Sequence, residues 1–313
     1  MLNGDVIDSR KFNILSLDGG GSKGVYSLGV LLEVEKQFGR PLCEVFDLIY
    51  GTSTGSIIAS LIALGKPIEE IEKLYLNLIP KIMKHKRANK RSEELRKESK
   101  SIFSNLKFDS FKTNIGIVAT HIEYAKPMIF KSNDLQAHGR KGSFESGFGS
   151  TISDAVLASC AAYPFFNKVK VETKIQGKPL LMDGGFVANN PTLFAIADAI
   201  NGYKIAPEKI NVLSIGVGEY PEPSKGFFWN KILNSLPFWL ARKTLSCNTN
   251  TNEIIRKILL PHISCIRINK SFTDKIYETD LLESDITKLE KIFQLGRESF
   301  PDFENEIIKL FER

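Results

Sequence analysis

Ser53 lies in the segment GTSTG at 51–55, with Gly51 and Gly55 two positions away on either side. Small neighbours relieve the crowding of a tight strand-to-helix turn, so a serine there can project its hydroxyl beyond the edge of a sheet. Such a serine is a candidate nucleophile for acyl transfer. The pentapeptide alone is a weak signal, and its weight comes from the strand and the apolar helix that we expect on either side of it.

A second glycine-rich segment, DGGGSKG at 18–24, directly follows an apolar stretch. From Gly19 to Gly24 it fits the GxGxxG pattern of dinucleotide-binding turns, which calls for an acidic residue about 20 positions later, at the end of the second strand. Glu44 is near that spacing but precedes the expected strand. The alternative interpretation of this segment is an oxyanion hole. In that case its backbone amides would face the negative oxygen of an intermediate formed at Ser53. We favour this oxyanion hole and assign it to the amides of Gly20, Gly21 and Ser22.

A serine nucleophile needs a base, and the sequence offers two solutions. Asp183 ends an apolar segment and precedes Gly184 and Gly185, which permit close backbone approach. His262 would complete the order Ser, Asp, His of α/β-hydrolases, although its surroundings do not look like a site loop. A Ser53–Asp183 dyad and a triad that includes His262 therefore both stay open at this point. The remaining histidines stand in unpromising contexts: His85, His121 and His138.

The elements that must position these residues follow from hydrophobic periodicity. Short apolar runs predict strands before each glycine turn, and helical spacing predicts a helix after each. Consecutive strand–turn–helix units indicate a parallel sheet with covering helices, and their turns should meet at one sheet edge. The predicted strands are 12–17, 46–50, 115–120, 127–130, 168–173, 180–183 and 212–217. The predicted helices are 25–38, 56–64, one starting at 67, 151–162 and 283–298.

Composition sets the class of protein. The chain has 313 residues, of which 42% are hydrophobic and 25% charged, which excludes disorder and fibrous repeats. The four cysteines form no CxxC pair, so we expect reduced thiols and no metal site. No apolar run approaches the roughly 18 to 20 residues that span a bilayer. We therefore expect a cytoplasmic protein that can still contact a membrane peripherally.

Two further segments stand out by composition. Residues 81–100 hold nine Lys or Arg against three Glu, which accounts for the whole net charge of +6. This basic segment fits a solvated helix face, an anionic membrane contact or a phosphate contact. Residues 227–240 contain both tryptophans and form an amphipathic pattern. That pattern suits a membrane-interface helix, a lid, or a helix packed on the core or at a homodimer interface.

Taken together, these motifs resemble the patatin-like phospholipases. The matching pieces are DGGGSKG at 18–24, GTSTG at 51–55, ASCAAYPFF at 158–166, and DGG at 183–185 with its trailing Asn-Asn-Pro. The resemblance covers about residues 12–218. Two positions depart from the commonest pattern of the family, since Lys23 replaces the commoner Arg and Val217 stands where Thr is frequent.

The resemblance implies a three-layer α/β/α fold with a mostly parallel central sheet, as a single domain over 1–313 with a variable part at 219–313. It also implies a reaction: Ser53 attacks a lipid ester carbonyl, Asp183 takes its proton, and water hydrolyses the acyl-enzyme to release a fatty acid and a lysophospholipid. The amides of the glycine loop hold the oxyanion, and no metal or cofactor is implied. The residues carried over for backbone shape are Gly19, Gly24, Gly51, Gly55, Gly184 and Gly185.

A narrower likeness is to bacterial antiphage effectors of the cyclic-oligonucleotide signalling type. It implies a lipase for antiviral defence that a cyclic di- or trinucleotide switches on, with membrane phospholipids as substrate at the inner face of the membrane and no DNA or RNA partner. Two other readings remain beside it: an esterase with the His262 triad, and a non-catalytic adaptor that binds lipid or nucleotide. The intact Ser53 and Asp183 argue against the adaptor.

Overall fold

The computed structural model describes residues 10–139, 142, 144–222 and 236–312. Within these ranges one eight-stranded sheet has the order β5-β6-β3-β2-β1-β7-β8, and β4 pairs with β3 outside this path. Its parallel strands are β1 (Phe12–Leu17), β2 (Leu48–Thr52), β3 (Asn114–His121), β7 (Ile210–Ile215) and β8 (Ser264–Ile268). The antiparallel strands are β4 (Lys126–Lys131), β5 (Val169–Lys170) and β6 (Leu180–Asp183).

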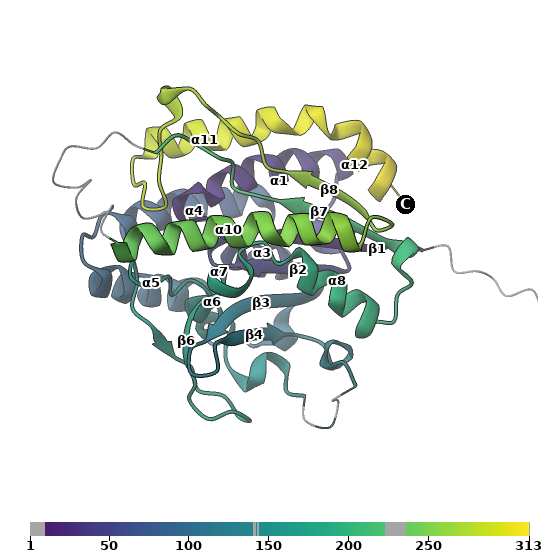
Figure 1. Cartoon of the computed structure of the whole chain (residues 1–313), viewed down its shortest axis with the longest axis horizontal. Coiled ribbons are helices and arrows are strands. Elements are labelled where there is room, and N and C mark those ends of the chain that lie inside the picture. The colour runs from purple at the N-terminus through teal and green to yellow at the C-terminus, as the bar shows by residue number, and fades with distance from the viewer. Residues whose placement is uncertain (1–9, 140–141, 143, 223–235, 313) are drawn as a thin grey trace, which may run out of the picture.

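Helices cover both faces of the sheet (Figure 1). The larger core lies under α1 (Gly24–Phe38), α3 (Thr54–Ala63), α4 (Ile68–Met83), α5 (Ala88–Phe103), α6 (Ile152–Ser159), α11 (Ile286–Ser299) and α12 (Glu304–Phe311), next to the short α2 (Leu42–Val45). A smaller core lies under α8 (Thr192–Asn201) and the end of α7 (Gly185–Ala188) on the other face. The long helix α10 (Leu236–Leu259) crosses the viewer's side of the molecule in Figure 1. The predicted three-layer α/β class with a mostly parallel sheet is confirmed.

The sequence of the central strands explains their place. β1 and β7 are almost wholly buried, as expected for strands that helices cover on both faces, and they pair in register from Phe12 with Ile210 to Leu17 with Ile215. β2 pairs with β1 in parallel on the other side. The turns after β1 and β2 therefore meet at one sheet edge, as the repeated strand–turn–helix pattern predicted.

Several predicted boundaries were wrong. The second strand is Leu48–Thr52 rather than 46–50, and the strand expected at 168–173 has only its two residues Val169–Lys170 in the sheet. The basic segment contains the end of α4 and most of α5, whose buried residues include Leu95 and Phe103. Of the amphipathic segment 227–240, residues 227–235 lie outside the described residues, and 236–240 begin α10. No helix in the described ranges is both long and apolar enough to cross a bilayer.

Candidate active site

Ser53 occupies a strained turn between β2 and α3. Its backbone has φ 53° and ψ −128°, in the left-handed half of φ space that non-glycine residues rarely adopt. Its amide donates a hydrogen bond to Ser159 Oγ at 2.8 Å. A Cβ atom at Gly51 would lie 2.4 Å from the Gly55 carbonyl oxygen, so the turn closes too tightly for any side chain there. The segment 51–55 therefore has the tight strand-to-helix turn that a nucleophile elbow requires.

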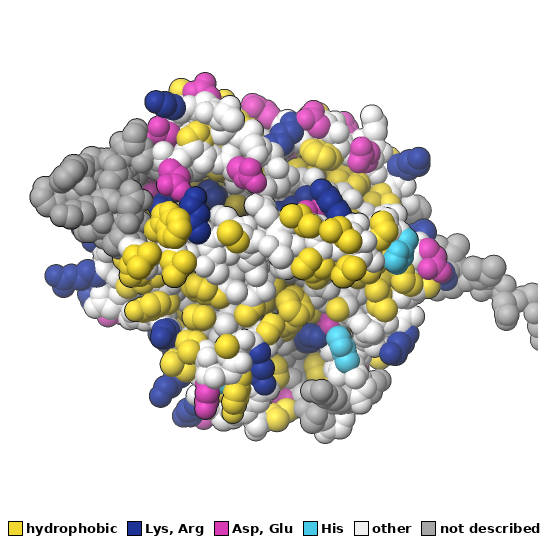
Figure 2. Space-filling model, viewed as in Figure 1, with side chains coloured by type: hydrophobic (Ala, Val, Ile, Leu, Met, Phe, Trp, Pro, Cys, Tyr) yellow, Lys and Arg dark blue, Asp and Glu magenta, His cyan; other side chains and the backbone are white. Residues whose placement is uncertain are grey.

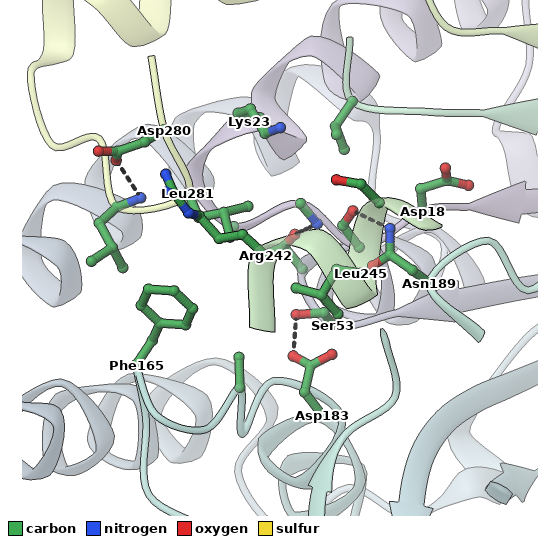
Figure 3. A pocket seen from close by; sticks show the side chains of 18 of the residues that line it. Asp18, Lys23, Ser53, Phe165, Asp183, Asn189, Arg242, Leu245, Asp280 and Leu281 are labelled. Atoms are coloured by element: carbon green, nitrogen blue, oxygen red, sulfur yellow. Dashed lines mark hydrogen bonds between the residues drawn. The ribbon is translucent and has the colours of Figure 1, made fainter. Parts of the chain in front are cut away.

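Asp183 faces this serine from the end of β6. Ser53 Oγ donates a hydrogen bond to Asp183 Oδ2 at 2.6 Å (Figure 3). The Gly185 amide donates to Asp183 Oδ1 at 2.7 Å. Burial raises the pKa of Asp183 to about 7, against the opposing effect of these two hydrogen bonds. The carboxyl group can therefore both take up and release a proton near neutral pH.

The backbone around Asp183 is fixed on several sides. Thr120 Oγ1 donates to the Asp183 carbonyl oxygen at 2.8 Å, and the Asp183 amide donates to the Ala161 carbonyl at 3.0 Å. A Cβ atom at Gly184 would lie 2.1 Å from the backbone oxygen of Val118, so only glycine permits this approach to β3. The position of the carboxylate thus depends on the central sheet itself.

The glycine loop after β1 packs directly behind the serine. A Cβ atom at Gly19 would lie 3.0 Å from Ser53 Cβ and 2.5 Å from Asn189 Oδ1. Asn189 Nδ2 donates to the Gly19 carbonyl at 3.1 Å, which ties the loop to the segment after Asp183. Asp18, at the start of the loop, forms a two-pronged ion pair with Arg267 of β8 at 2.8 and 2.5 Å. Asp18 is therefore engaged in holding the loop.

The three amides predicted for the oxyanion hole differ in their hydrogen bonds. The Ser22 amide donates to the Leu281 carbonyl at 3.1 Å, and its hydroxyl donates to the Glu283 carbonyl at 2.7 Å. The Gly20 amide makes a long contact of 3.3 Å to Thr54 Oγ1, whereas the Gly21 amide meets no acceptor in the described part of the chain. In this conformation the Ser22 amide is not available, because a segment 259 residues further along the chain occupies it.

A pocket of about 380 Å³ opens at Ser53 and Asp183 (Figure 3). Its apolar wall comes mainly from α3, α4, α5 and the turn after α6: Ile57, Ile79, Ile82, Met83, Leu95, Phe165 and Phe166. Its polar lining includes Lys23, Glu219, Glu222, Arg242 and Asp280. One wall is thus suited to an alkyl chain, and charged groups lie elsewhere in the same cavity.

Cys160 also lines this pocket, close to Ser53 and Asp183. Burial and the nearby Asp183 charge raise the pKa of its thiol far above the usual value. Because the thiolate is the reactive form, Cys160 is not a competing nucleophile.

The histidines do not join the site. His262 is exposed and precedes β8, which runs parallel to β7, so it lies at the amino ends of the strands, opposite the edge that carries Ser53. His138 binds Asp198, and His121 packs its ring on Tyr124. The geometry thus favours the dyad over the triad. The structure also gives no support to the alternative of a dinucleotide-binding turn, because Glu44 lies in α2, before β2.

Three supporting residues escaped the sequence reasoning: Ser159, Asn189 and Arg267. Arg267 had a signal, because a lone charged residue in the apolar strand SCIRI indicates a buried ionic partner. Ser159 and Asn189 sit in small-residue and Asn-Asn-Pro segments that were noted but not assigned a contact. No cluster of three or more metal-ligating side chains occurs in the described ranges.

The sequence of this chain is similar to those of known proteins. The sequence profile of the patatin-like phospholipases matches residues 15–196. The chain is 48% identical over 287 residues to a cUMP-AMP-activated phospholipase of Escherichia coli, covering 92% of this chain and 90% of that protein. It is 26% identical to a cGAMP-activated phospholipase of Escherichia coli strain TW11681, over 68% of this chain and 64% of that protein.

The fold also resembles the crystal structure of VipD from Legionella pneumophila. The TM-score is 0.51 at 13% sequence identity, over 95% of this chain and 67% of that one, which supports the fold alone. The family, the fold and the hydrolase class that the sequence motifs predicted are confirmed. The chain belongs to the patatin-like phospholipase family.

Proposed function

We propose that this protein hydrolyses acyl esters of membrane phospholipids, with Ser53 as nucleophile and Asp183 as general base. The observation that carries the proposal is the 2.6 Å hydrogen bond from Ser53 Oγ to Asp183 Oδ2, inside a pocket with an apolar wall. A family of lipases and a relative at 48% identity that is a phospholipase support the same assignment.

The chemistry follows from this contact in two halves. Ser53 Oγ attacks the ester carbonyl while its proton passes to Asp183, and Asp183 then returns that proton to the departing lysophospholipid oxygen. Water next attacks the acyl-serine and gives its proton to Asp183. Collapse of the second intermediate breaks the bond to Ser53 Oγ, which recovers the proton as the fatty acid leaves.

We assign the oxyanion to the amides of Gly20 and Gly21. The Ser22 amide joins them only if the Leu281 carbonyl withdraws, because the two now form a hydrogen bond. Each well-placed donor of this kind contributes about 10²-fold or more to the rate. In the conformation described here, the segment 279–283 therefore restrains the oxyanion hole.

This restraint fits a regulated lipase. The relative at 48% identity is activated by cUMP-AMP, and a second relative is activated by cGAMP. We propose that a cyclic di- or trinucleotide activates this protein too, by favouring a state in which segment 279–283 releases the glycine loop. An enzyme that degrades its own cell's inner membrane needs such control, and we propose antiviral defence as its setting.

The test is fatty-acid release from vesicles of bacterial phospholipids, in EDTA, with and without cUMP-AMP or cGAMP. Wild type, Ser53→Ala and Asp183→Asn are compared with Ser101→Ala, a control serine exposed on α5. We expect release by wild type and the control, stimulation by one nucleotide, and loss of release in the other two variants. Release that persists in Ser53→Ala would refute the nucleophile, and no release by any form would favour a non-catalytic adaptor.

A further inference from the structure

Three polar side chains of helix α10 face the body of the protein: Asn248, Thr249 and Asn252. Asn248 Oδ1 accepts the Asn189 amide at 2.7 Å, and Asn248 Nδ2 donates to the Val187 carbonyl at 3.0 Å. Thr249 Oγ1 accepts from Asn189 Nδ2 at 2.8 Å, and Asn252 Nδ2 donates to the Asn190 carbonyl at 3.2 Å. These bonds fasten α10 to the segment that follows Asp183.

Exposed apolar side chains stand at both ends of the same helix, on either side of a polar middle. Leu236 is 71% exposed, Ile258 69% and Leu259 67%. Figure 2 shows hydrophobic side chains gathered over α10 on this face of the molecule. A helix in water ordinarily places most of its large apolar side chains inward, so this many exposed ones on a single helix indicate a partner. We define the outer face of α10 as Leu236, Trp239, Leu240, Ile254, Ile258 and Leu259.

The charged side chains of α10 indicate which class of partner this is. The sole carboxylate within Leu236–Leu259 is Glu253, which binds Arg256 at 3.0 and 2.8 Å and is largely buried. Lys243 and Lys257 are exposed. Lys257 also pairs with Glu253 at 3.5 Å, and Arg242 pairs with Glu222. A helix with exposed apolar and cationic side chains, and with its one acid paired, complements anionic lipid. A second copy of the same face would offer these lysines no carboxylate in return.

The other side of α10 forms part of the wall of the catalytic pocket. Arg242, Leu245 and Thr249 of α10 line that pocket, and Phe238 packs edge-on against Phe165 with ring centroids 5.0 Å apart. Lys168 Nζ lies 4.9 Å above the ring of Tyr163, two residues before Phe165. Helix α10 and the segment after α6, which carry exposed apolar, aromatic and cationic side chains, therefore also supply walls of the pocket that holds Ser53.

We propose that the outer face of α10 docks on an anionic lipid surface and presents the pocket to it. This inference rests on the proposed phospholipase function and names the surface through which it acts. Docking there brings one wall of the pocket to the bilayer, so an acyl chain has a short path from the membrane to Ser53.

The experiment measures partitioning of the full-length protein onto vesicles of phosphatidylglycerol and phosphatidylethanolamine. The test variants are Trp239→Ser with Leu240→Ser, and Ile258→Ser with Leu259→Ser. The matched control is Leu106→Ser with Ile286→Ser, which removes exposed apolar side chains from other elements. Each test variant should lose about tenfold or more in partition coefficient, as expected for two apolar side chains that no longer enter lipid. The control should partition like wild type.

A charge variant gives a second readout. Lys243→Gln should reduce the preference for phosphatidylglycerol over phosphatidylcholine by a factor of about five. Hydrolysis of a short-chain ester in free solution should stay within about twofold of wild type in all these variants, since none of the altered residues lines the pocket.

Wild-type partitioning by both apolar variants would overturn the proposal. A lipid-free wild-type dimer that both variants convert to monomer would identify a second copy as the partner and overturn it as well. The experiment distinguishes failure of the docking surface from failure of the proposed function. If no form hydrolyses the soluble ester but the variants still lose vesicle binding, the lipase assignment fails and the docking surface is supported.

Discussion

At the scale of single residues, Asp183 sets the pH at which the site can work. Burial raises its pKa to about 7, so below that pH the carboxyl group holds a proton and cannot accept the one from Ser53. We expect kcat/KM on a soluble ester to be about tenfold lower at pH 6 than at pH 8, with a plateau above neutrality. A profile from pH 5 to 9 at constant ionic strength measures this, and a flat profile would exclude Asp183 as the base.

Residue types and order in the sequence were enough to predict Ser53 and Asp183 as candidate partners, because each follows a strand and is framed by glycine. The hydrogen bond from the Ser22 amide to the Leu281 carbonyl could not be predicted from the sequence. No local pattern indicates which distant carbonyl will occupy a given amide, so the sequence could not show that the Ser22 amide is already hydrogen-bonded in this conformation. The partner of Asp18 was missed for a different reason, because Arg267 lies in β8, a strand that the sequence analysis did not predict.

At the scale of elements, α10 is held by side-chain hydrogen bonds in addition to the apolar contacts of Phe238 and Ala241. Asn248→Ala removes both the bond to the Asn189 amide and the bond to the Val187 carbonyl. We expect the free energy of unfolding to fall by about 1–3 kcal/mol, because two partly buried backbone groups lose their partners. Urea denaturation measures it, with Thr251→Ala on the exposed side of α10 as control. Equal stability of the two variants would contradict this view of the helix.

The same feature explains why the sequence did not reveal α10. Its middle, SCNTNTN at 246–252, consists largely of Asn and Thr, which are poor helix formers and read as a loop. Tertiary hydrogen bonds override that propensity. By contrast, β1, α1 and α3 follow clear periodicity and were predicted, because their helical or strand pattern coincides with burial on the core.

At the scale of the whole molecule, the C-terminal part completes the sheet. β8 extends the sheet beyond β7, and α11 crosses α1 so closely that a Cβ at Gly29 would lie 2.1 Å from the Phe293 carbonyl oxygen. We expect a chain ending at residue 218 to aggregate, because it lacks both elements, and the full chain to melt in one cooperative transition. Calorimetry of both chains tests the single-domain prediction. Two separate transitions in the full chain, or a folded product from 1–218, would contradict it.

The central claim is that Asp183 activates Ser53 as a nucleophile, and covalent labelling tests it most directly. The full-length protein is treated with a long-chain fluorophosphonate at pH 8, and the modified peptide is mapped by mass spectrometry. We expect one phosphonate on Ser53, no label in Ser53→Ala, and labelling slower by about 10²-fold or more in Asp183→Asn. A label at another residue, or labelling of Ser53 at the wild-type rate in Asp183→Asn, would contradict the assignment.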